Sequence, residues 1–511
     1  MTTGSSRKNN VAQERSTSLW MSGPAIAASR EDMTGLADLL VVIGGGMAGL
    51  SIAYEAAVKG RQVLVLDRGA IASGMTARTT AHLASALDDY YCEFISLRGE
   101  KEAALLHRSL TAAIDRIEQI ARLEGIDCDF ARLDGYLFAA RPEDQALLAR
   151  EYDACRAIGC PVEWAEKMPV FDAGRVLRFP SQARFHPLKY LSGLTQALLR
   201  LGVRLRPFAA VSAVEQKEAG VFVTLTGGEV IQARDVAVAT NSPIAGRLML
   251  HTKMAPYRTY AMAFAVAKGA VPDALYWDTL DAYHYVRLQP GDEEDWLIVG
   301  GEDHKTGEAD DAPRRFEALE NWARARFAGL GHVTHRWSGQ VLEPVDYAGF
   351  VGRDPDHDHV YLVTGDSGQG ITNGAIGGLL IAALLEDEDH PWRGLYDPAR
   401  VSPKAAGTFV SENATAVKGL AEHLGGGVLA SEAELGREQG GLLQQGMTKV
   451  GVYRDADGAV HRVSATCTHV GCVVHFNSFE RCWDCPCHGS HFGVDGEVLN
   501  APATAPLKPI T

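Results

Sequence analysis

The sequence predicts an α/β domain with a parallel sheet, an antiparallel β-rich domain inserted into it, and a small all-β domain at the C-terminal end. Three observations predict this order: a glycine-rich turn between a strand and a helix near residue 44, alternating aromatic-rich strands in the middle, and two boxes of Cys and His after residue 466. At 511 residues, the chain has room for about three folding units of about 150 residues each.

The charge, the apolar runs and the cysteine count of the chain argue against several classes of protein. The net charge of −15 argues against a nucleic-acid partner. No run of about 18 apolar residues occurs, so we expect no integral membrane association. Nine cysteines in a chain of this length do not make a disulfide scaffold, since five of them lie between Cys467 and Cys487.

The first 37 residues are polar and rich in small side chains, and we expect a flexible tail there. A cleaved signal peptide is the alternative, but Ser22, Gly23 and Pro24 interrupt the only apolar stretch. We therefore expect a cytoplasmic protein.

A nucleotide-binding motif begins the first domain. Leu39 to Ile43 form a short apolar run typical of a buried strand, and a Gly-x-Gly-x-x-Gly turn opens a helical pattern directly after it. A second apolar strand, Val63 to Leu66, ends in an acid. This is a Rossmann-type arrangement, in which a purely structural glycine turn is the weaker alternative. Its expected binding residues are Gly44, Gly46, Gly49 and Asp67.

The stretch after the acid indicates which dinucleotide binds. Residues 72–83 are rich in small hydroxylated side chains, with Ser73 and Thr76 in a Ser-Gly-x-Thr segment. This segment resembles the D-amino acid oxidase-like family of FAD enzymes, and residues 236–241, including Thr240, and 337–346 resemble further stretches of the same family. The resemblance covers roughly residues 38–395 and implies an FAD-binding domain over 38–400.

A second glycine-rich turn follows a late strand. Tyr361 to Thr364 lead into Gly365, Gly368 and Gly370, which open an apolar helix. Such a turn presents backbone N–H groups and the positive end of a helix, which suit a flavin ring or its phosphates. A plain tight connection is the alternative.

Alternating strands over 203–225 and 257–299 separate the nucleotide segments. In the family that the chain resembles, such strands form a discontinuous substrate domain, here roughly 90–190 and 250–335. Its polar and aromatic residues that could face a substrate are Arg258, Tyr260, Tyr283, Tyr285, Arg287 and His304. Arg can clamp a carboxylate, and Tyr can shape an amine pocket. Surface pairs and strand-filling aromatics are the alternative, least so for Tyr285 and Arg287, which resemble the active-site strand of the family.

The C-terminal boxes are the most specific motif. Cys467 and His469 stand one residue apart, and Cys485 and His488 stand two apart. Two thiolates on one iron and two imidazoles on the other make a Rieske [2Fe-2S] centre. A structural zinc site and a thioredoxin-like pair of Cys482 with Cys485 are the alternatives, although zinc modules do not usually mix the two ligand types in each box.

The remaining cysteines of the boxes, Cys472 and Cys487, stand at equivalent offsets and can close a disulfide. Both boxes resemble Rieske domains of the cytochrome bc type, which carry that disulfide, rather than those of ring-hydroxylating dioxygenases. Those domains usually have Tyr two residues after the cluster Ser, whereas Phe492 follows Ser490 here. We therefore expect a less oxidising cluster, since hydrogen bonds to sulfur raise the potential.

A helical linker over 401–427 joins the halves. Residues 402–424 have the pattern of one amphipathic helix, and Gly425, Gly426 and Gly427 mark the boundary with a Rieske domain over 428–511.

Together these features predict an FAD-dependent dehydrogenase or oxidase that acts on the C–N bond of a small amine or amino-acid-like substrate. Electrons would pass from FAD through the cluster to an unknown acceptor. A reductase linked to NAD(P)H or ferredoxin and a redox sensor that uses the cluster are the alternatives, although no second Gly-x-Gly-x-x-Gly follows a strand and opens a helix. We expect noncovalent FAD, with His82 as the alternative point of attachment.

Overall fold

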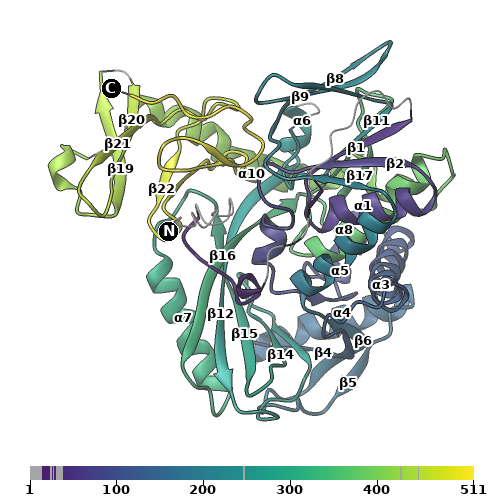
Figure 1. The fold of residues 1–511 in the computed structure, drawn as a ribbon. Coiled ribbons are helices and arrows are strands. Elements are labelled where there is room, and N and C mark those ends of the chain that lie inside the picture. Colours follow the sequence, from purple (N-terminus) through teal and green to yellow (C-terminus); the bar gives the residue numbers. More distant parts are fainter. Residues whose placement is uncertain are drawn as a thin grey trace, which may run out of the picture.

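The computed structural model describes residues 14–23, 26, 28–29, 38–244, 248–425, 429–446 and 448–510 (Figure 1). Among these residues, no helix combines the length and the apolar character needed to cross a membrane.

A six-stranded sheet forms the nucleotide-binding layer, at the upper right in Figure 1. All its neighbours pair in parallel except β17 with β18. In spatial order the strands are β17 (Phe350–Arg353), β18 (Val360–Thr364), β11 (Asp235–Val238), β1 (Leu39–Ile43), β2 (Gln62–Leu66) and β7 (Arg204–Arg206).

The central strand of this sheet is buried on both faces, which is why its sequence is a continuous apolar run. Leu40 and Val42 pack into the core that contains the helices, and Leu39, Val41 and Ile43 pack into the core on the opposite face. The helices are α1 (Met47–Val58), α3 (Glu100–Leu123), α5 (Pro187–Arg200) and α8 (Gly370–Leu384). The opposite face meets a small sheet of β8 (Val211–Lys217), β9 (Gly220–Leu225) and β10 (Val230–Ala233).

This arrangement corrects one expectation. The strands over 203–225 do not join the substrate sheet, because β7 pairs with β2 and β8 and β9 pack on the nucleotide layer.

A nine-stranded sheet lies beneath the nucleotide layer in Figure 1. It combines strands from two distant stretches of the chain. In order they are β16 (Val333–Pro344), β12 (Met254–Val266), β15 (Asp295–Lys305), β14 (Tyr285–Gln289), β13 (Leu275–Asp278), β4 (Ala131–Phe138), β6 (Val176–Arg184) and β3 (His82–Leu83), with β5 (Glu163–Ala165) on β6. Helix α7 (Ala312–Arg326) packs against β12 and β15, and α2 (Tyr91–Arg98) packs against α4 (Gln145–Ile158).

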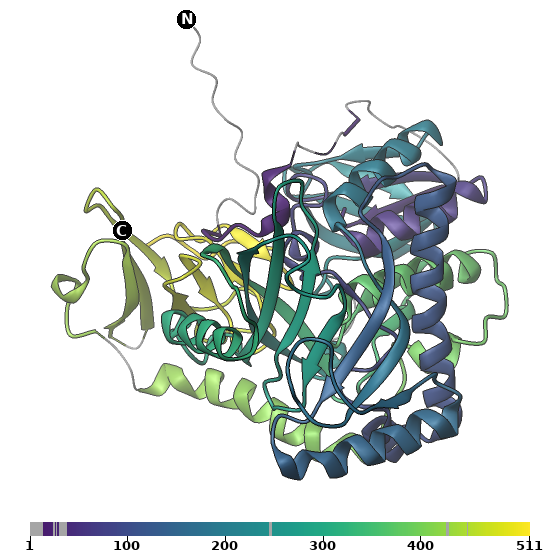
Figure 2. The same cartoon turned by 90° about the horizontal axis from the view of Figure 1, so that it is seen from below.

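The C-terminal domain consists of two small sheets. One contains β19 (Gln439–Gln445), β20 (Thr448–Arg454) and β21 (Val460–Ser464), and the other contains β22 (His475–Asn477), β23 (Cys482–Asp484), β24 (His491–Phe492) and β25 (Val498–Asn500). The linker helix α10 (Ala406–Ala421) reaches it across the molecule (Figure 2), flanked by short 3-10 turns rather than running as one helix from 402 to 424. Gly426 and Gly427 of the predicted boundary lie outside the described residues.

The N-terminal segment departs from the expected flexible tail. Residues 14–23 are ordered against both domains, and Trp20 is fully buried. The indole of Trp20 donates to the carbonyl of Thr79, and the amide of Arg15 donates to the carbonyl of Glu480. The segment therefore bridges the nucleotide layer and the C-terminal domain.

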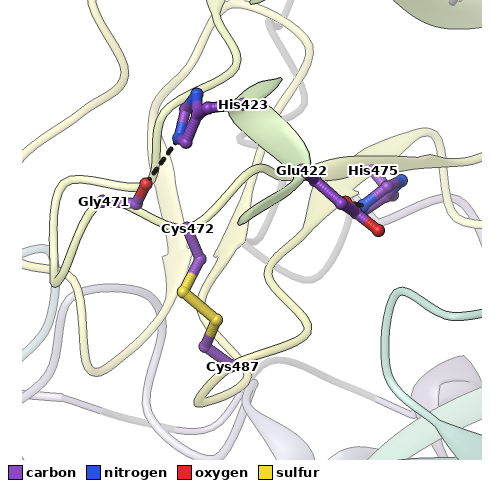
Figure 3. Close-up of a disulfide and its surroundings, with 6 residues drawn as sticks. All are labelled: Glu422, His423, Gly471, Cys472, His475 and Cys487. Carbon is purple, nitrogen blue, oxygen red and sulfur yellow. Dashed lines mark hydrogen bonds and ion pairs between the residues drawn. A yellow bond between two sulfur atoms is a disulfide. The ribbon is translucent and has the colours of Figure 1, made fainter. Parts of the chain in front are cut away.

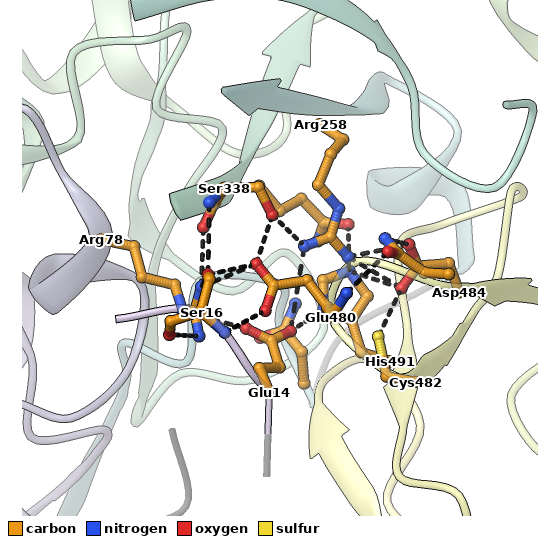
Figure 4. Close-up of polar contacts among 12 residues, drawn as sticks. Glu14, Ser16, Arg78, Arg258, Ser338, Glu480, Cys482, Asp484 and His491 are labelled. Carbon is orange, nitrogen blue, oxygen red and sulfur yellow. Dashed lines mark hydrogen bonds and ion pairs between the residues drawn. The ribbon is translucent and has the colours of Figure 1, made fainter. Parts of the chain in front are cut away.

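A buried network of charged side chains fastens this junction (Figure 4). Arg78 contacts Glu14 at 2.9 Å and Glu480 at 3.0 Å, with both carboxylates buried. The Nη2 of Arg258 donates to both carboxylate oxygens of Asp484 at 2.8 Å, and the arginine has no exposure. Burial alone would raise the pKa of Glu14, but Arg78 and the other cations hold it well below its ordinary value.

We predict that Glu480→Ala lowers the apparent melting temperature by about 5 °C or more, because removing one partner of a buried pair costs about 3–5 kcal/mol. Thermal unfolding followed by circular dichroism measures this. The control is Glu215→Ala, since the pair of Glu215 with Lys217 is 59% exposed on both sides and should contribute almost nothing. Equal melting of the two variants would contradict the prediction.

Candidate active site and cluster site

The glycine-rich turn after β1 is built for close approach. Gly44 has φ +108°, and a Cβ there would lie 2.3 Å from the carbonyl oxygen of Ala239. A Cβ on Gly49 would lie 1.8 Å from the carbonyl oxygen of Gly44, so α1 can pack against the turn only with glycine at that position. Gly46 is the N-cap of α1, and a Cβ there would lie 2.9 Å from the hydroxyl of Thr76.

This turn opens onto a cavity of about 500 Å³ between the nucleotide layer and the nine-stranded sheet. The residues that start α1 and α8 line it, which turns two positive helix ends toward its interior. Of the ten residues expected to bind a dinucleotide, nine line this cavity, and Gly49 alone packs behind the turn instead. The nine are Gly44, Gly46, Asp67, Ser73, Thr76, Thr240, Gly365, Gly368 and Gly370.

The polar groups at the nucleotide end are positioned by the backbone. Asp67 accepts from the amides of Gly45 and Gly69, each at 2.7 Å, which places its carboxylate at the carboxyl end of β2. The hydroxyl of Thr76 accepts from the amide of Met47 at 3.0 Å, at the first residue of α1. These contacts keep a ribose-binding acid and a helix end on the same side of the cavity.

Another part of the cavity lining is aromatic and acidic. Trp277, Tyr283 and Tyr285 line it, and the hydroxyl of Tyr283 donates to Asp88 at 2.8 Å. Tyr285 shares a hydrogen bond of 2.6 Å with Thr259 and packs edge-on against His82.

Six carboxylates line this cavity besides Asp67: Glu14, Asp88, Asp303, Glu343, Asp366 and Glu497. Burial raises the pKa of Asp88 to about 7, and the neighbouring Asp89, Asp303 and Asp366 add to the rise against the hydrogen bond from Tyr283. Burial also raises the pKa of Asp303 and of Asp366 to about 6. His82 shows the opposite effect, since burial lowers its pKa to about 3 and keeps the imidazole neutral.

Four of the expected substrate-facing residues do not line the cavity, and Tyr283 and Tyr285 do. Arg258 lies in the junction network, paired with Asp484. Arg287 is fully buried and donates to the carbonyls of Ala81 and Phe185 at 2.8 and 3.0 Å. Tyr260 stacks on His304, with ring centroids 5.7 Å apart. Long-range packing partners, which the sequence does not reveal, explain these differences.

The two Cys/His boxes form matching loops in the C-terminal domain. The amide of Gly471 donates to the carbonyl of Cys467, and the amide of Gly489 donates to that of Cys485, each at 3.0 Å. Both glycines have positive φ, 88° and 76°, which explains why each box contains one.

These loops bring all four expected ligands together. The rings of His469 and His488 lie 5.0 Å apart, and the side chains of Cys467 and Cys485 hydrogen-bond to each other. Neither cysteine is in a disulfide. The buried Nδ1 of His488 has no hydrogen-bond partner among the described residues, which suits a nitrogen that binds metal.

The remaining two cysteines form the disulfide that the sequence predicts (Figure 3). Cys472 and Cys487 are joined with their Cα atoms 6.5 Å apart. The linker contacts this bridge, because a Cβ on Gly419 of α10 would lie 3.1 Å from the sulfur of Cys487. His423 shares a hydrogen bond of 2.8 Å with the carbonyl of Gly471, so the linker also fixes the first loop (Figure 3).

Comparison with known proteins agrees with both sites. Residues 40–384 match the family "FAD dependent oxidoreductase", and residues 427–511 match "Rieske [2Fe-2S] domain". The chain belongs to the FAD dependent oxidoreductase family. It binds FAD, and its C-terminal domain holds a Rieske [2Fe-2S] cluster.

Relatives of this FAD dependent oxidoreductase share all or part of its architecture. It is 29% identical over 513 residues to the "Putative Rieske 2Fe-2S iron-sulfur protein YhfW" of Bacillus subtilis (strain 168), covering 98% of this chain and 99% of that protein. A cytochrome b6-f complex iron-sulfur subunit of Nicotiana tabacum is 40% identical over 89 residues, covering 16% of this chain and 39% of the subunit. The crystal structure of glycine oxidase from Geobacillus kaustophilus superposes with a TM-score of 0.60 at 18% identity, covering 71% of this chain and 98% of that one.

Several residues of this oxidoreductase's sites carry no motif. His251, from the short helix α6 (Leu248–His251), packs its ring 4.9 Å from His469 and 5.7 Å from His488. The carboxylates Asp88 and Asp303 also belong to no recognisable sequence motif. Only the folded chain brings such residues to a site, so sequence reasoning missed them.

We predict that Gly46→Leu abolishes FAD binding, because a side chain there would collide with Thr76 and fill the turn that faces the cavity. The 450 nm absorbance of the purified protein, on the order of one flavin per chain in the wild type, measures the loss. Gly227→Leu is the control, since a Cβ there meets nothing within 4 Å. A Gly46→Leu protein with full flavin content would contradict the assignment of this turn.

We predict that Ser490→Ala lowers the reduction potential of the cluster. Ser490 is fully buried, and its hydroxyl hydrogen-bonds to Cys467, a type of contact that stabilises the reduced state. A redox titration followed by electron paramagnetic resonance measures the potential. Ser464→Ala, on β21, should leave it unchanged, and an unchanged potential in Ser490→Ala would contradict the prediction.

Proposed function

We propose that this protein oxidises the C–N bond of a small amine or amino-acid-like substrate and passes the electrons from FAD through the Rieske cluster to an external acceptor. One observation carries the electron path: the C-terminal domain supplies part of the wall of the FAD cavity. Its contributing residues are Glu497, Val498, Leu499, Asn500, Ala501, Ala503, Thr504 and Pro506.

Two side chains that line the cavity also contact the loop of the cluster ligand His488. Gln340 lines the cavity, and its amide nitrogen donates at 3.0 Å to the carbonyl of Gly489, the residue after the ligand His488. Asn500 also lines the cavity and donates to the same carbonyl at 3.3 Å. A single side chain therefore spans from the flavin cavity to a ligand loop, which supports direct electron transfer within one chain.

The residues that would hold FAD follow from the cavity. The backbone of Gly44 and Gly46 and the positive ends of α1 and α8 suit the pyrophosphate and the flavin ring, and Asp67 suits a ribose hydroxyl. Cys467 and Cys485 would bind one iron, and His469 and His488 the other. Bound FAD supplies a hydride acceptor that also releases single electrons.

The chain's own groups would manage the substrate proton. Oxidation of RCH2–NH3⁺ gives RCH=NH2⁺, a hydride that goes to FAD, and a proton that needs a base. Asp88 is placed to accept it, because its pKa of about 7 lies near neutrality and Tyr283 orients the carboxylate. The resemblance of the fold to glycine oxidase supports this class of reaction.

The test removes the cluster and keeps the flavin. We predict that His488→Ala loses the low-field Rieske signal in electron paramagnetic resonance, while substrate still bleaches the flavin under anaerobic conditions. Reduction of cytochrome c, used as an artificial acceptor, should fall by about tenfold or more, since the one-electron exit is gone.

The matched control is His475→Ala. His475 lies in the same domain and pairs with Glu422 at 2.8 Å, so its loss should leave both the cluster signal and acceptor reduction in place. Equal acceptor reduction by wild type and His488→Ala would end the proposed role of the cluster as the exit. Failure of every amine and amino acid to bleach the flavin would end the proposed C–N chemistry.

A further inference from the structure

We propose that the substrate is an organic ammonium ion without an α-carboxylate, that is, an amine rather than an amino acid. The inference rests on the proposed function, because it names the substrate class of the same cavity.

The substrate end of the cavity has the composition of an ammonium site. Trp277, Tyr283 and Tyr285 provide aromatic faces, and the rings of the two tyrosines lie 5.4 Å apart. Aromatic faces attract ammonium groups, and carboxylates pair with them through charged hydrogen bonds. Asp88 and Asp303 supply such carboxylates among the same lining residues.

The carboxyl group of Asp303 hydrogen-bonds to Thr259, but one of its two oxygens lacks a donor that a ligand could provide. Its Oδ1 is buried and has no hydrogen-bond partner among the described residues, although the side chain lines the cavity. A buried carboxylate oxygen without a partner is costly, and an ammonium N–H would satisfy it. This oxygen is evidence for a ligand that is independent of the number of acids nearby.

A carboxylate on the substrate would find no free cation here. Two arginines and no lysine occur among the described residues that line the cavity. Arg78 is already held by Glu14 and Glu480 and is 1% exposed. Arg68 follows Asp67 at the end of β2, where the nucleotide binds. The two arginines that resembled a carboxylate clamp, Arg258 and Arg287, are buried elsewhere.

The acids also repel one another unless a cation is present. Asp89 and Glu343 both lie within hydrogen-bond distance of the hydroxyl of Ser367, at 2.9 and 3.1 Å, although one hydroxyl can donate to only one of them. Burial raises the pKa of both acids. A bound ammonium ion would offset this repulsion, whereas a carboxylate would increase it.

The test compares each amine with the amino acid that carries one additional carboxylate. The flavin-containing enzyme is titrated anaerobically with 2-phenylethylamine against phenylalanine and with cadaverine against lysine. Perturbation of the flavin absorbance reports binding, and bleaching reports oxidation. We expect at least one amine to bind about tenfold or more tightly than its amino acid, because the latter places a carboxylate among acids.

A pair of variants locates the effect. Asp303→Asn should weaken binding of the amine about tenfold and reduce the preference for amine over amino acid. Asp281→Asn is the matched control, since Asp281 is exposed and does not line the cavity. Flavin content and melting temperature establish that each variant is folded, and the wild-type comparison stands without either variant.

The outcomes separate this inference from the proposed function. Tighter binding of the amino acids than of the amines, or no change in flavin absorbance with either amine, would overturn the ammonium site. Bleaching of the flavin by the amino acids would still support the proposed C–N oxidation. Tight amine binding without bleaching would support the ammonium site and contradict the proposed C–N oxidation.

Discussion

The junction between the FAD-binding part and the C-terminal domain depends on the pairing of buried charges. Arg78 and Arg258 are almost completely removed from water, and their carboxylate partners come from the N-terminal segment and the C-terminal domain. A different arrangement of the domains that kept these side chains out of water would leave the charges unpaired, which costs several kcal/mol for each ion. Both arginines belong to the FAD-binding part. The network therefore favours one position of the C-terminal domain against that part, the position in which every buried charge is paired.

The docked position of the C-terminal domain brings the cluster loop close to the flavin cavity. Docking through Asp484 and Glu480 brings the neighbouring loop of Cys485 and His488 against Gln340, and it brings residues 497–506 into the cavity wall. The linker helix reinforces this position, since Gly419 packs on the disulfide. The ligand loop and the wall of the flavin cavity are thus in direct contact, as the proposed electron path requires.

Features that depend on residues close together in the sequence could be predicted, and features that depend on distant residues could not. The turn at Gly44 to Gly49 and the loops of Cys467 and Cys485 follow from steric and ligand requirements within a few residues, and the structure shows both. The role of Arg258 depends on Asp484, 226 positions away, and that of Trp20 on Thr79. A polar N-terminal stretch looks like a flexible tail unless such partners are known, and an Arg on a strand looks like a substrate clamp for the same reason.

The cavity contains both positive helix ends and acidic side chains, and the origin of these groups connects the chemistry to the fold. The N-terminal ends of α1 and α8 give one part a positive potential, which suits an anionic dinucleotide. Two of the acids lie beside one of these helix ends, since a Cβ on Gly368 would lie 2.5 Å from Asp88 and a Cβ on Gly370, at the start of α8, would lie 2.7 Å from Asp366. Asp303 and Glu343 come from β15 and β16 of the nine-stranded sheet, whereas the helix ends and Asp366 come from the nucleotide layer, so the packing of the two layers brings these groups to one cavity. A reaction that removes a proton and a hydride from a cation suits such a cavity, because a carboxylate could accept the proton and bound FAD would accept the hydride.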